Sequence, residues 1–288
     1  MSVRVVTDST SDIPPQVAAD LGVCIVPLMV LFGDEELRDG VDVTSEQFFK
    51  RLTREAATPT TAQPSVGAFR EVFESLVADG ATAIVSCHLS ARLSGTYESA
   101  RQAAEGLAVP VLLVDSAQVS LGLGVGVLQA AKAARDGATA QQVQAVAADV
   151  FRRTRTYITL ETLEYLRRGG RLSRGQELVG SLLKVKPILE IKDGEVEAVA
   201  RIRTKQKAIE EILSRCADLR PWQFAFAVHA TTPQEVEYIA DRFRGLSEET
   251  PVMTGRMTPV LGVHAGPGGV GLGVVSAPDE ASPPFLPT

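Results

Sequence analysis

The stretch Thr-Ala-Ile-Val-Ser-Cys-His-Leu-Ser-Ala-Arg-Leu-Ser-Gly-Thr at residues 82–96 decides the fold class of this chain. It starts with an apolar, β-branched run over 82–86, continues through small polar residues, and enters a helix pattern over 96–105. A near-continuous apolar run predicts a strand covered on both faces, as in a parallel sheet. The stretch therefore predicts one strand, loop and helix unit of an α/β fold.

The same alternation continues through the first half of the chain. Further strand-like runs lie at 3–6, 23–30 and 109–114, and helix patterns at 14–21, 45–54, 65–78 and 121–134. We therefore predict an N-terminal α/β domain over residues 1–155, with a parallel Rossmann-like sheet and flanking helices. In such sheets ligands bind at the carboxyl ends of the strands.

After residue 155 the pattern changes to hairpins. Apolar runs at 187–191 and 196–202 flank Asp193-Gly194, a pair that favours a tight hairpin turn. Additional strands are predicted at 224–228 and 260–264, with helices at 205–216 and 234–243. These patterns predict an α+β domain with hairpin strands over 156–288, of which the proline-rich residues 276–288 are expected to form a disordered tail.

Composition narrows the class of protein. Of 288 residues, 45% are hydrophobic and 22% charged, as in a globular protein, and the net charge of −6 argues against a nucleic-acid partner. Cys24, Cys87 and Cys216 are too scattered for a disulfide framework or a zinc site. No signal-peptide pattern or membrane-spanning tract is apparent, so a cytoplasmic protein is expected.

Small polar residues gather at three places where this fold would present them to a ligand. Thr60–Ser65 precedes a helix, and Ser94-Gly95-Thr96 lies between a strand and a helix, so hydroxyls and backbone N–H groups could bind an anion in both. Plain helix capping is the alternative in both cases. His264 at a predicted strand end could bond an oxyanion or be satisfied within the core.

Several classes of catalytic site are excluded by the absence of their motifs. The sequence has no Gly-x-Ser-x-Gly, Walker or His-Glu-x-x-His motif, its three histidines lack metal-ligand spacing, and the glycines at 266–271 precede no helix. We therefore expect a site that binds a small acidic headgroup, without a metal and without a catalytic residue. An α/β phosphotransferase or hydrolase using Asp8, Ser94 and His264 remains the alternative. The acceptor-rich residues 7–12 could hold a metal or phosphate, or form Asx turns.

Two basic runs interrupt the acidic average, Leu166–Arg174 and Arg201–Lys207. Such runs usually form a solvated face. Arg201 and Arg203 share one side of a predicted strand end, however, which also makes them available for docking an acidic partner.

Five segments together resemble the DegV family of bacterial fatty-acid-binding proteins, and they occur in the family's order. These are Val6–Ile13, Thr61–Ser65, Leu93–Thr96, Arg168–Arg171 and His264–Gly268. The chain departs from the family pattern at Ala62, where a serine is typical, and so lacks one hydroxyl. The resemblance implies two α/β domains, with an acyl chain buried in the first and its carboxyl near the junction.

The resemblance also implies a function. Family members present a bound fatty acid to a separate ATP-dependent kinase subunit, which phosphorylates the carboxyl group. By motif, Thr61 and Ser94 would bond the carboxyl, Gly95 would allow close approach, and His264 would lie beside it. Arg203 matches the family's arginine for kinase docking, with Arg201 two residues away. The expected ligand is a long-chain fatty acid, with no cofactor, and transient contact with a membrane is possible.

The free energy gained by burying an acyl chain agrees with a carrier role. Burying about fourteen methylenes at about 0.8 kcal/mol each gives about 11 kcal/mol of gross driving force. An unpaired buried carboxylate would cost several kcal/mol, so hydroxyl and N–H donors are needed where the chain enters. We expect no lysine or arginine next to these donors.

Overall fold

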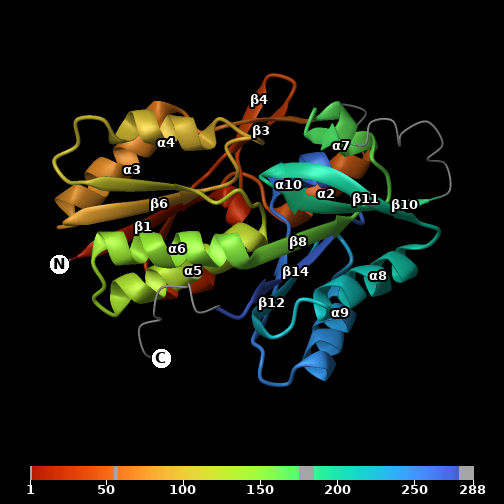
Figure 1. Cartoon of the computed structure of the whole chain (residues 1–288). Coiled ribbons are helices and arrows are strands. Elements are labelled where there is room, and N and C mark those ends of the chain that lie inside the picture. Colours follow the sequence, from red (N-terminus) through yellow and green to blue (C-terminus); the bar gives the residue numbers. More distant parts are fainter. Residues whose placement is uncertain (1, 55–57, 175–184, 279–288) are drawn as a thin grey trace.

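The computed structural model describes residues 2–54, 58–174 and 185–278, arranged around two large sheets and one small sheet (Figure 1). The first sheet has the order β2-β1-β6-β7 and all its pairings are parallel, which confirms the predicted fold class. Its strands are β1 (Val3–Asp8), β2 (Val23–Val26), β6 (Ala83–His88) and β7 (Val111–Asp115).

Helices cover both faces of the first sheet (Figure 1). On one face α3 buries Phe69 and Phe73 against Ile84 of β6; on the other, α5 and α6 bury Leu123 and Val143 with Val85. Burial on both faces explains why these strands are continuously apolar. The helices of this part are α1 (Pro15–Asp20), α3 (Val66–Ala78), α4 (Thr96–Ala104), α5 (Leu121–Arg135) and α6 (Ala140–Arg153), and Ser9–Ser11 form a 3₁₀ turn, η1.

The second sheet is mixed, in the order β13-β12-β14-β8-β10-β11-β9. The predicted hairpin is present, because Asp193 and Gly194 both have positive φ, 49° and 79°, between antiparallel β10 and β11. Helices α8 (Lys205–Ala217) and α9 (Pro233–Leu246) cover one face. The strands are β8 (Thr154–Thr159), β9 (Leu172–Arg174), β10 (Lys186–Lys192), β11 (Glu195–Ile202), β12 (Trp222–His229), β13 (Val252–Arg256) and β14 (Val270–Ser276).

A small antiparallel sheet, β4-β3-β5, lies with the remaining helices over the other face of the second sheet. Phe48 of α2 packs in one cluster with Val30 of β3 and with Phe226 and Val228 of β12. The small sheet therefore packs against elements from the second half of the chain. Its strands are β3 (Met29–Phe32), β4 (Glu35–Arg38) and β5 (Thr60–Ala62), and the helices are α2 (Ser45–Arg54), α7 (Glu164–Arg168) and α10 (Pro259–Ala265).

The chain enters the second sheet at Thr154, close to the boundary predicted at 155. Because β3, β4 and β5 precede that point yet contact the second half, the division at 155 stays a prediction. The predicted tail falls largely on 279–288, outside the described residues.

Two predicted elements were wrong. Residues 260–264 form helix α10 and not a strand, because Pro259 starts a helix at its first position and Gly262 packs against the rings of Phe48 and Phe49. The single strand predicted over 23–30 is two strands, β2 and β3, that belong to different sheets and are separated by Pro27.

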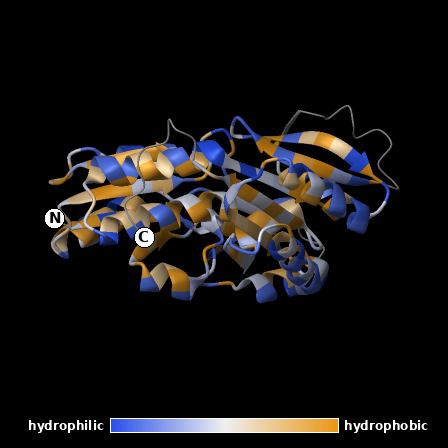
Figure 2. Cartoon of the chain, turned by 60° about the horizontal axis from the view of Figure 1, so that its bottom comes forward, coloured by the Kyte–Doolittle hydropathy of each residue, from blue (hydrophilic) through white to orange (hydrophobic). Residues whose placement is uncertain are grey.

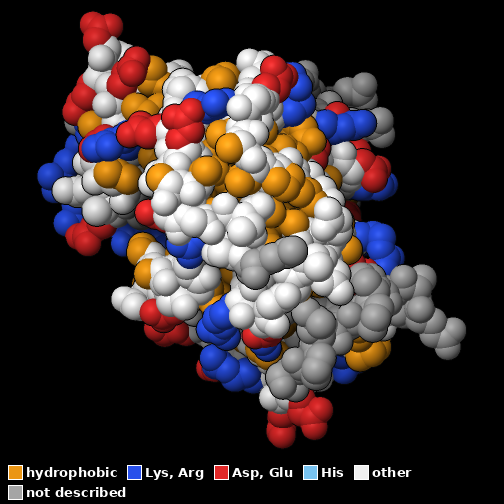
Figure 3. Space-filling view, turned by 90° about the vertical axis from the view of Figure 1, so that its left-hand side faces the viewer, with side chains coloured by type: hydrophobic (Ala, Val, Ile, Leu, Met, Phe, Trp, Pro, Cys, Tyr) orange, Lys and Arg blue, Asp and Glu red, His pale blue; other side chains and the backbone are white. Residues whose placement is uncertain are grey.

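Hydrophobic residues concentrate in the strands and on the inner sides of the helices (Figure 2). One side of the molecule shows acidic and basic side chains interspersed around apolar ones, with no continuous basic field (Figure 3). The three cysteines are free thiols, as predicted. Within the described part of the chain, no helix combines the length and apolarity needed to cross a bilayer.

Candidate functional site

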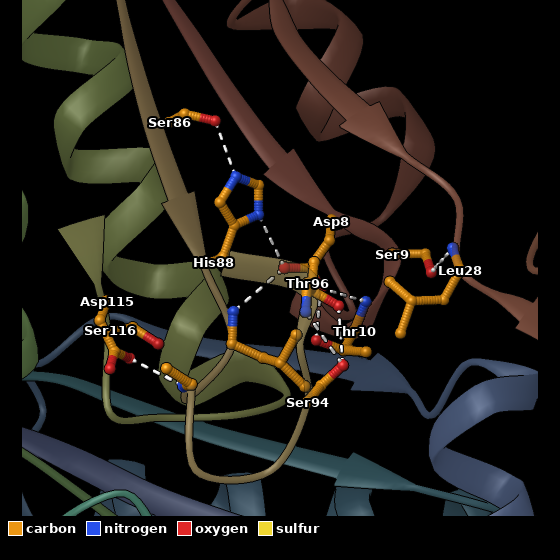
Figure 4. Close-up of polar contacts among 12 residues, drawn as sticks. Asp8, Ser9, Thr10, Leu28, Ser86, His88, Ser94, Thr96, Asp115 and Ser116 are labelled. Atoms are coloured by element: carbon orange, nitrogen blue, oxygen red, sulfur yellow. Dashed lines mark hydrogen bonds and ion pairs between the residues drawn. The ribbon is translucent and has the colours of Figure 1, made fainter. Parts of the chain in front are cut away.

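The turn after β1 is held by hydrogen bonds to Asp8, whose side chain is inaccessible to solvent (Figure 4). Asp8 Oδ1 accepts hydrogen bonds from the backbone N and the hydroxyl of Thr10, at 3.1 and 2.5 Å, and so caps η1. Its Oδ2 accepts from Leu89 N at 3.0 Å and lies 3.0 Å from His88 Nδ1. Both oxygens are thus occupied, which confirms the Asx-turn interpretation of this segment.

Ser86, His88 and Asp8 are joined like the groups of a serine hydrolase, since Ser86 Oγ lies 2.7 Å from His88 Nε2 (Figure 4). All three side chains have zero exposed surface, and Phe69 packs edge-on against the His88 ring. A nucleophile must reach its substrate, so this sealed arrangement ties β1 to β6 and does no chemistry.

A cavity of about 310 Å³ lies between the loops at the carboxyl ends of the first sheet and one face of the second sheet, within the size range of small-molecule sites. Residues from both halves of the chain line it, and aliphatic side chains form most of the wall. Among them are Leu28, Leu89, Leu160, Leu189, Val196 and Val260. An apolar wall of this kind suits a hydrocarbon chain better than a polar metabolite.

Thr61 and His264 form one polar end of this cavity. Thr61 lies on edge strand β5 and His264 in the last turn of α10, and Thr61 Oγ1 is 3.0 Å from His264 Nε2. Burial, assisted by Arg171, lowers the pKa of His264 from 6.5 to about 4, so the imidazole is neutral at pH 7. Its Nδ1 is buried without a hydrogen-bond partner among the described residues.

Ser94 lines the same cavity from the loop before α4. Its Oγ lies 2.8 Å from Thr96 Oγ1 and accepts from Thr96 N at 3.3 Å. Gly95 is the N-cap of α4 and has no side chain to cap it, whereas Ser94 Oγ accepts the N–H of the first helical residue, Thr96, so the capping alternative holds in part for Ser94. A Cβ on Gly95 would lie 2.3 Å from Gln63 Oε1, so the glycine is needed for close approach of the Gln63 side chain.

Ser65 does act as a cap, because its Oγ accepts from Ala68 N at 3.1 Å at the start of α3. The capping alternative therefore holds for Ser65. Thr61, four residues earlier, belongs instead to β5 and pairs with Val30. The segment thus serves both purposes, with different residues.

Arg171 is a residue of the site that sequence reasoning missed. It lines the cavity together with Thr61 and Ser94, so the expectation that no cation lies next to these donors was wrong. Its guanidinium donates to the carbonyls of Leu93 at 3.1 Å and Gly169 at 2.5 Å, which fixes it across the two halves of the chain. The signal was available, since Arg171 ends one of the family-like segments.

A smaller hollow of about 130 Å³ adjoins the polar end and shares Thr61, Arg171 and His264 with the cavity. Tyr165 and Arg168 of α7 also line it. The polar end is therefore bordered on one side by the apolar cavity and on the other by a hollow with two arginines.

Of the groups proposed for an enzyme, Ser94 and His264 line the same cavity, whereas Asp8 is inaccessible to solvent and does not line it. Asp8 is occupied by His88 and Thr10, whereas His264 lies against Thr61 and Ser94 against Thr96. Among the described residues, no group of three or more His, Cys, Asp or Glu side chains is placed to hold a metal ion.

Arg201 and Arg203 are exposed at the end of β11. Lys205, from the same run, forms an ion pair of 2.5 Å with Glu235 and is neutralised. Arg201 and Arg203 are therefore the arginines of this run that face solvent at the strand end.

The fold and the apolar cavity can now be compared with known proteins. A family model described as "Uncharacterised protein, DegV family" matches residues 2–277. The chain belongs to the DegV family. A DegV domain-containing protein of Halalkalibacterium halodurans is 37% identical over 274 residues, which cover 94% of this chain and 97% of the relative.

Two solved DegV structures share the architecture. A DegV family protein from Thermus thermophilus, described for its fatty acid binding, superimposes with a TM-score of 0.88 at 34% identity, covering 96% of this chain and 100% of the other. DegV of Bacillus subtilis, described as a fatty acid binding protein, gives a TM-score of 0.86 at 30% identity, covering 95% and 99%. The resemblance inferred from the five segments is thus confirmed.

Proposed function

We propose that this DegV protein binds a long-chain fatty acid, with the acyl chain in the cavity between the two sheets and the carboxyl at its polar end. The observation that supports this most strongly is a cavity with aliphatic walls that ends at Thr61, His264 and Arg171. The binding of fatty acids by the Thermus and Bacillus relatives supports the same choice. The acyl chain would then lie between the halves of the molecule and not within residues 1–155 alone.

The hydroxyls of the polar end are suited to a carboxylate. With neutral His264 donating from Nε2 to Thr61 Oγ1, the Thr61 hydroxyl proton is free for the ligand. Ser94 Oγ accepts from Thr96 N, and its own proton can also point at the carboxylate. Arg171 adds a positive charge at the entrance, which offsets the desolvation of the carboxylate.

The carrier role extends the proposal. The carboxyl would be presented to a separate ATP-dependent kinase subunit, and this chain would supply no catalytic residue. The hollow beside His264 leaves the carboxyl within reach from outside. The protein would work in the cytoplasm, without a cofactor of its own.

Kinase docking is assigned to Arg203, with Arg201 contributing less. Ile202, between them, pairs with Lys186, which forms an ion pair with Glu161. A Cβ on Gly268 would lie 2.6 Å from Glu161 Cγ, so this strand end adjoins the loop that follows α10. A partner bound at Arg203 would therefore lie close to the presented carboxyl.

A filled cavity tests the binding proposal. Leu189→Trp places an indole in the cavity wall and should abolish binding of the fluorescent fatty acid cis-parinaric acid. Val66→Trp adds the same side chain to the surface of α3 and should bind normally. Equal binding by the two folded variants would place the lipid elsewhere.

A further inference from the structure

Helix α10 is one wall of the cavity, and it is not capped by its own side chains. Val260, Leu261 and His264 line the cavity from this helix, while its N-cap Thr258 makes no side-chain cap bond. Instead, two carboxylates from distant parts of the chain accept the N–H groups of its first turn. Asp12 Oδ1 accepts from Thr258 N at 2.8 Å, and Asp39 Oδ1 accepts from Val260 N at 3.2 Å.

The other oxygen of each carboxylate is tied to a different element near the cavity. Asp12 Oδ2 accepts from Ser120 Oγ at 2.5 Å, at the start of α5. Asp39 Oδ2 accepts from Ser9 Oγ at 2.6 Å, and Ser9 Oγ accepts from Leu28 N at 3.1 Å. The two carboxylates therefore join α10 to neighbouring segments that also contribute to the cavity lining, through Ser120 and Leu28.

Backbone strain is concentrated at the same place. Asp12 has φ 52°, and its partner Ser120 has φ 60° and ψ −150°, a region almost restricted to glycine. Such conformations are unfavourable for residues other than glycine and persist only where the surroundings enforce them. The hydrogen bond between Ser120 and Asp12 is what the strained geometry makes possible.

We propose that Asp12 and Asp39 are positioning residues of the lipid site: they latch α10 to the neighbouring segments of the cavity wall, fix His264 beside Thr61, and set how readily bound lipid escapes. This inference rests on the proposed binding of a fatty acid in that cavity. Neither carboxylate touches the ligand; each acts through α10. Loosening the first turn would move the cavity wall and the imidazole together, because the helix has only seven residues.

The latch is held without a counter-cation. Asp12 and Asp39 are 4% and 2% exposed, and no lysine or arginine within the described residues forms an ion pair with either. Burial raises the pKa of Asp12 to about 7 and that of Asp39 to about 6. The other titratable or charged groups on the elements around α10 include Asp8 with His88, Arg256 at the end of β13, Glu46, Lys50, Arg51 and Arg54 of α2, and Glu164, Tyr165, Arg167 and Arg168 of α7.

The pH dependence has a definite sign. If lipid release requires α10 to lift, both carboxylates become hydrated and their pKa returns toward the usual 3.8. Lifting then releases protons, so it becomes easier as the pH rises. Between pH 6.5 and 8 the release rate should increase about fivefold, as follows from the linkage of these shifts.

Stopped-flow release of cis-parinaric acid from the full chain tests the latch. Wild type should release the probe faster at pH 8 than at pH 6.5. Asp12→Asn and Asp39→Asn carry neutral amides that mimic the protonated carboxyl groups, so both variants should release the probe more slowly than wild type at pH 8, with a flattened pH profile. Asp149→Asn is the matched control: Asp149 is equally buried, but it pairs with Arg153 in α6, away from α10, and this variant should keep the wild-type profile.

Each outcome separates the two proposals. If wild type binds no probe, the proposed function fails; if wild type binds but the folded Asn variants keep its pH dependence of release, the latch is wrong. If neither Asn variant folds, Ser120→Ala decides, because losing that hydrogen bond raises the pKa of Asp12 and must shift the pH profile upward. An unshifted profile overturns the latch.

Discussion

Replacing Gly169 by alanine should weaken the lipid site while the chain still folds. Gly169 ends α7 with φ −72°, so alanine is conformationally acceptable there. A Cβ at this position would lie only 2.1 Å from His264 Nδ1, and real Cβ contacts are not found below 3.0 Å. The ring must therefore retreat by about 1 Å in a close-packed interior, which breaks the 3.0 Å contact with Thr61.

The expected size follows from that one contact. A net hydrogen bond contributes about 0.5–1.5 kcal/mol, so affinity for a fatty acid should fall about two- to tenfold. Overpacking costs about 1–3 kcal/mol and offsets the gain of about 0.5–1 kcal/mol from Gly→Ala at a helical position, so the variant should be folded but no more stable than wild type. Fatty-acid titration and thermal unfolding measure the two quantities. Gly245→Ala, where a Cβ meets nothing within 4 Å, is the control and should bind normally.

A double variant makes the test decisive. With His264→Ala the ring is gone, so adding Gly169→Ala should cost no further affinity, as in a double-mutant cycle. The reasoning is refuted if Gly169→Ala binds as tightly as wild type, or if it weakens binding equally in the His264→Ala background.

Three further outcomes are expected. The double variant Thr61→Ala with Ser94→Ala should lower acyl-phosphate formation by the kinase about tenfold or more while most lipid is retained. The reason is that the acyl tail supplies most of the binding energy and the hydroxyls orient the carboxyl. An equal loss of bound lipid, measured by mass spectrometry, would contradict this. Arg203→Ala should leave lipid bound but weaken binding of the kinase in a titration, and added salt should weaken the wild-type complex in the same way. Unchanged affinity for the kinase at low salt would mean that Arg203 is only part of a solvated face. Thermal stability should fall from pH 6.5 to 8, because Asp12 and Asp39 have folded-state pKa values above their unfolded ones. Their contribution to stability is lost as the pH rises through about 7 and about 6. Asp12→Asn should flatten the slope of stability against pH, and an unchanged slope would contradict the assignment of that slope to Asp12.

The first sheet was predictable because each of its strands is a contiguous apolar run between helix patterns. Helix α10 was not, because Val-Leu-Gly-Val-His has the β-branched, glycine-containing composition of a strand. Its helical form is set by Pro259 and by contacts between Gly262 and α2, more than 200 residues earlier in the chain. Tertiary packing overrides local preference here.

The polar end of the site was predictable in part. Thr61 and His264 were paired through motif resemblance, and the structure places them 3.0 Å apart. Arg171 was assigned to a solvated run because its place depends on the turn after α7 that brings it to Leu93. Asp12 and Asp39 could not be linked to α10 from sequence, since the bonds to Thr258 and Val260 span 246 and 221 residues.

The central claim is that the cavity between the sheets holds a fatty acid, and mass spectrometry of the purified chain tests it most directly. Protein extracted under denaturing conditions should release close to one long-chain fatty acid per chain, and Leu189→Trp should release far less. A folded wild-type protein that releases no stoichiometric fatty acid, exchanges none with added lipid, and turns over a phosphoester would contradict the account and favour the enzyme.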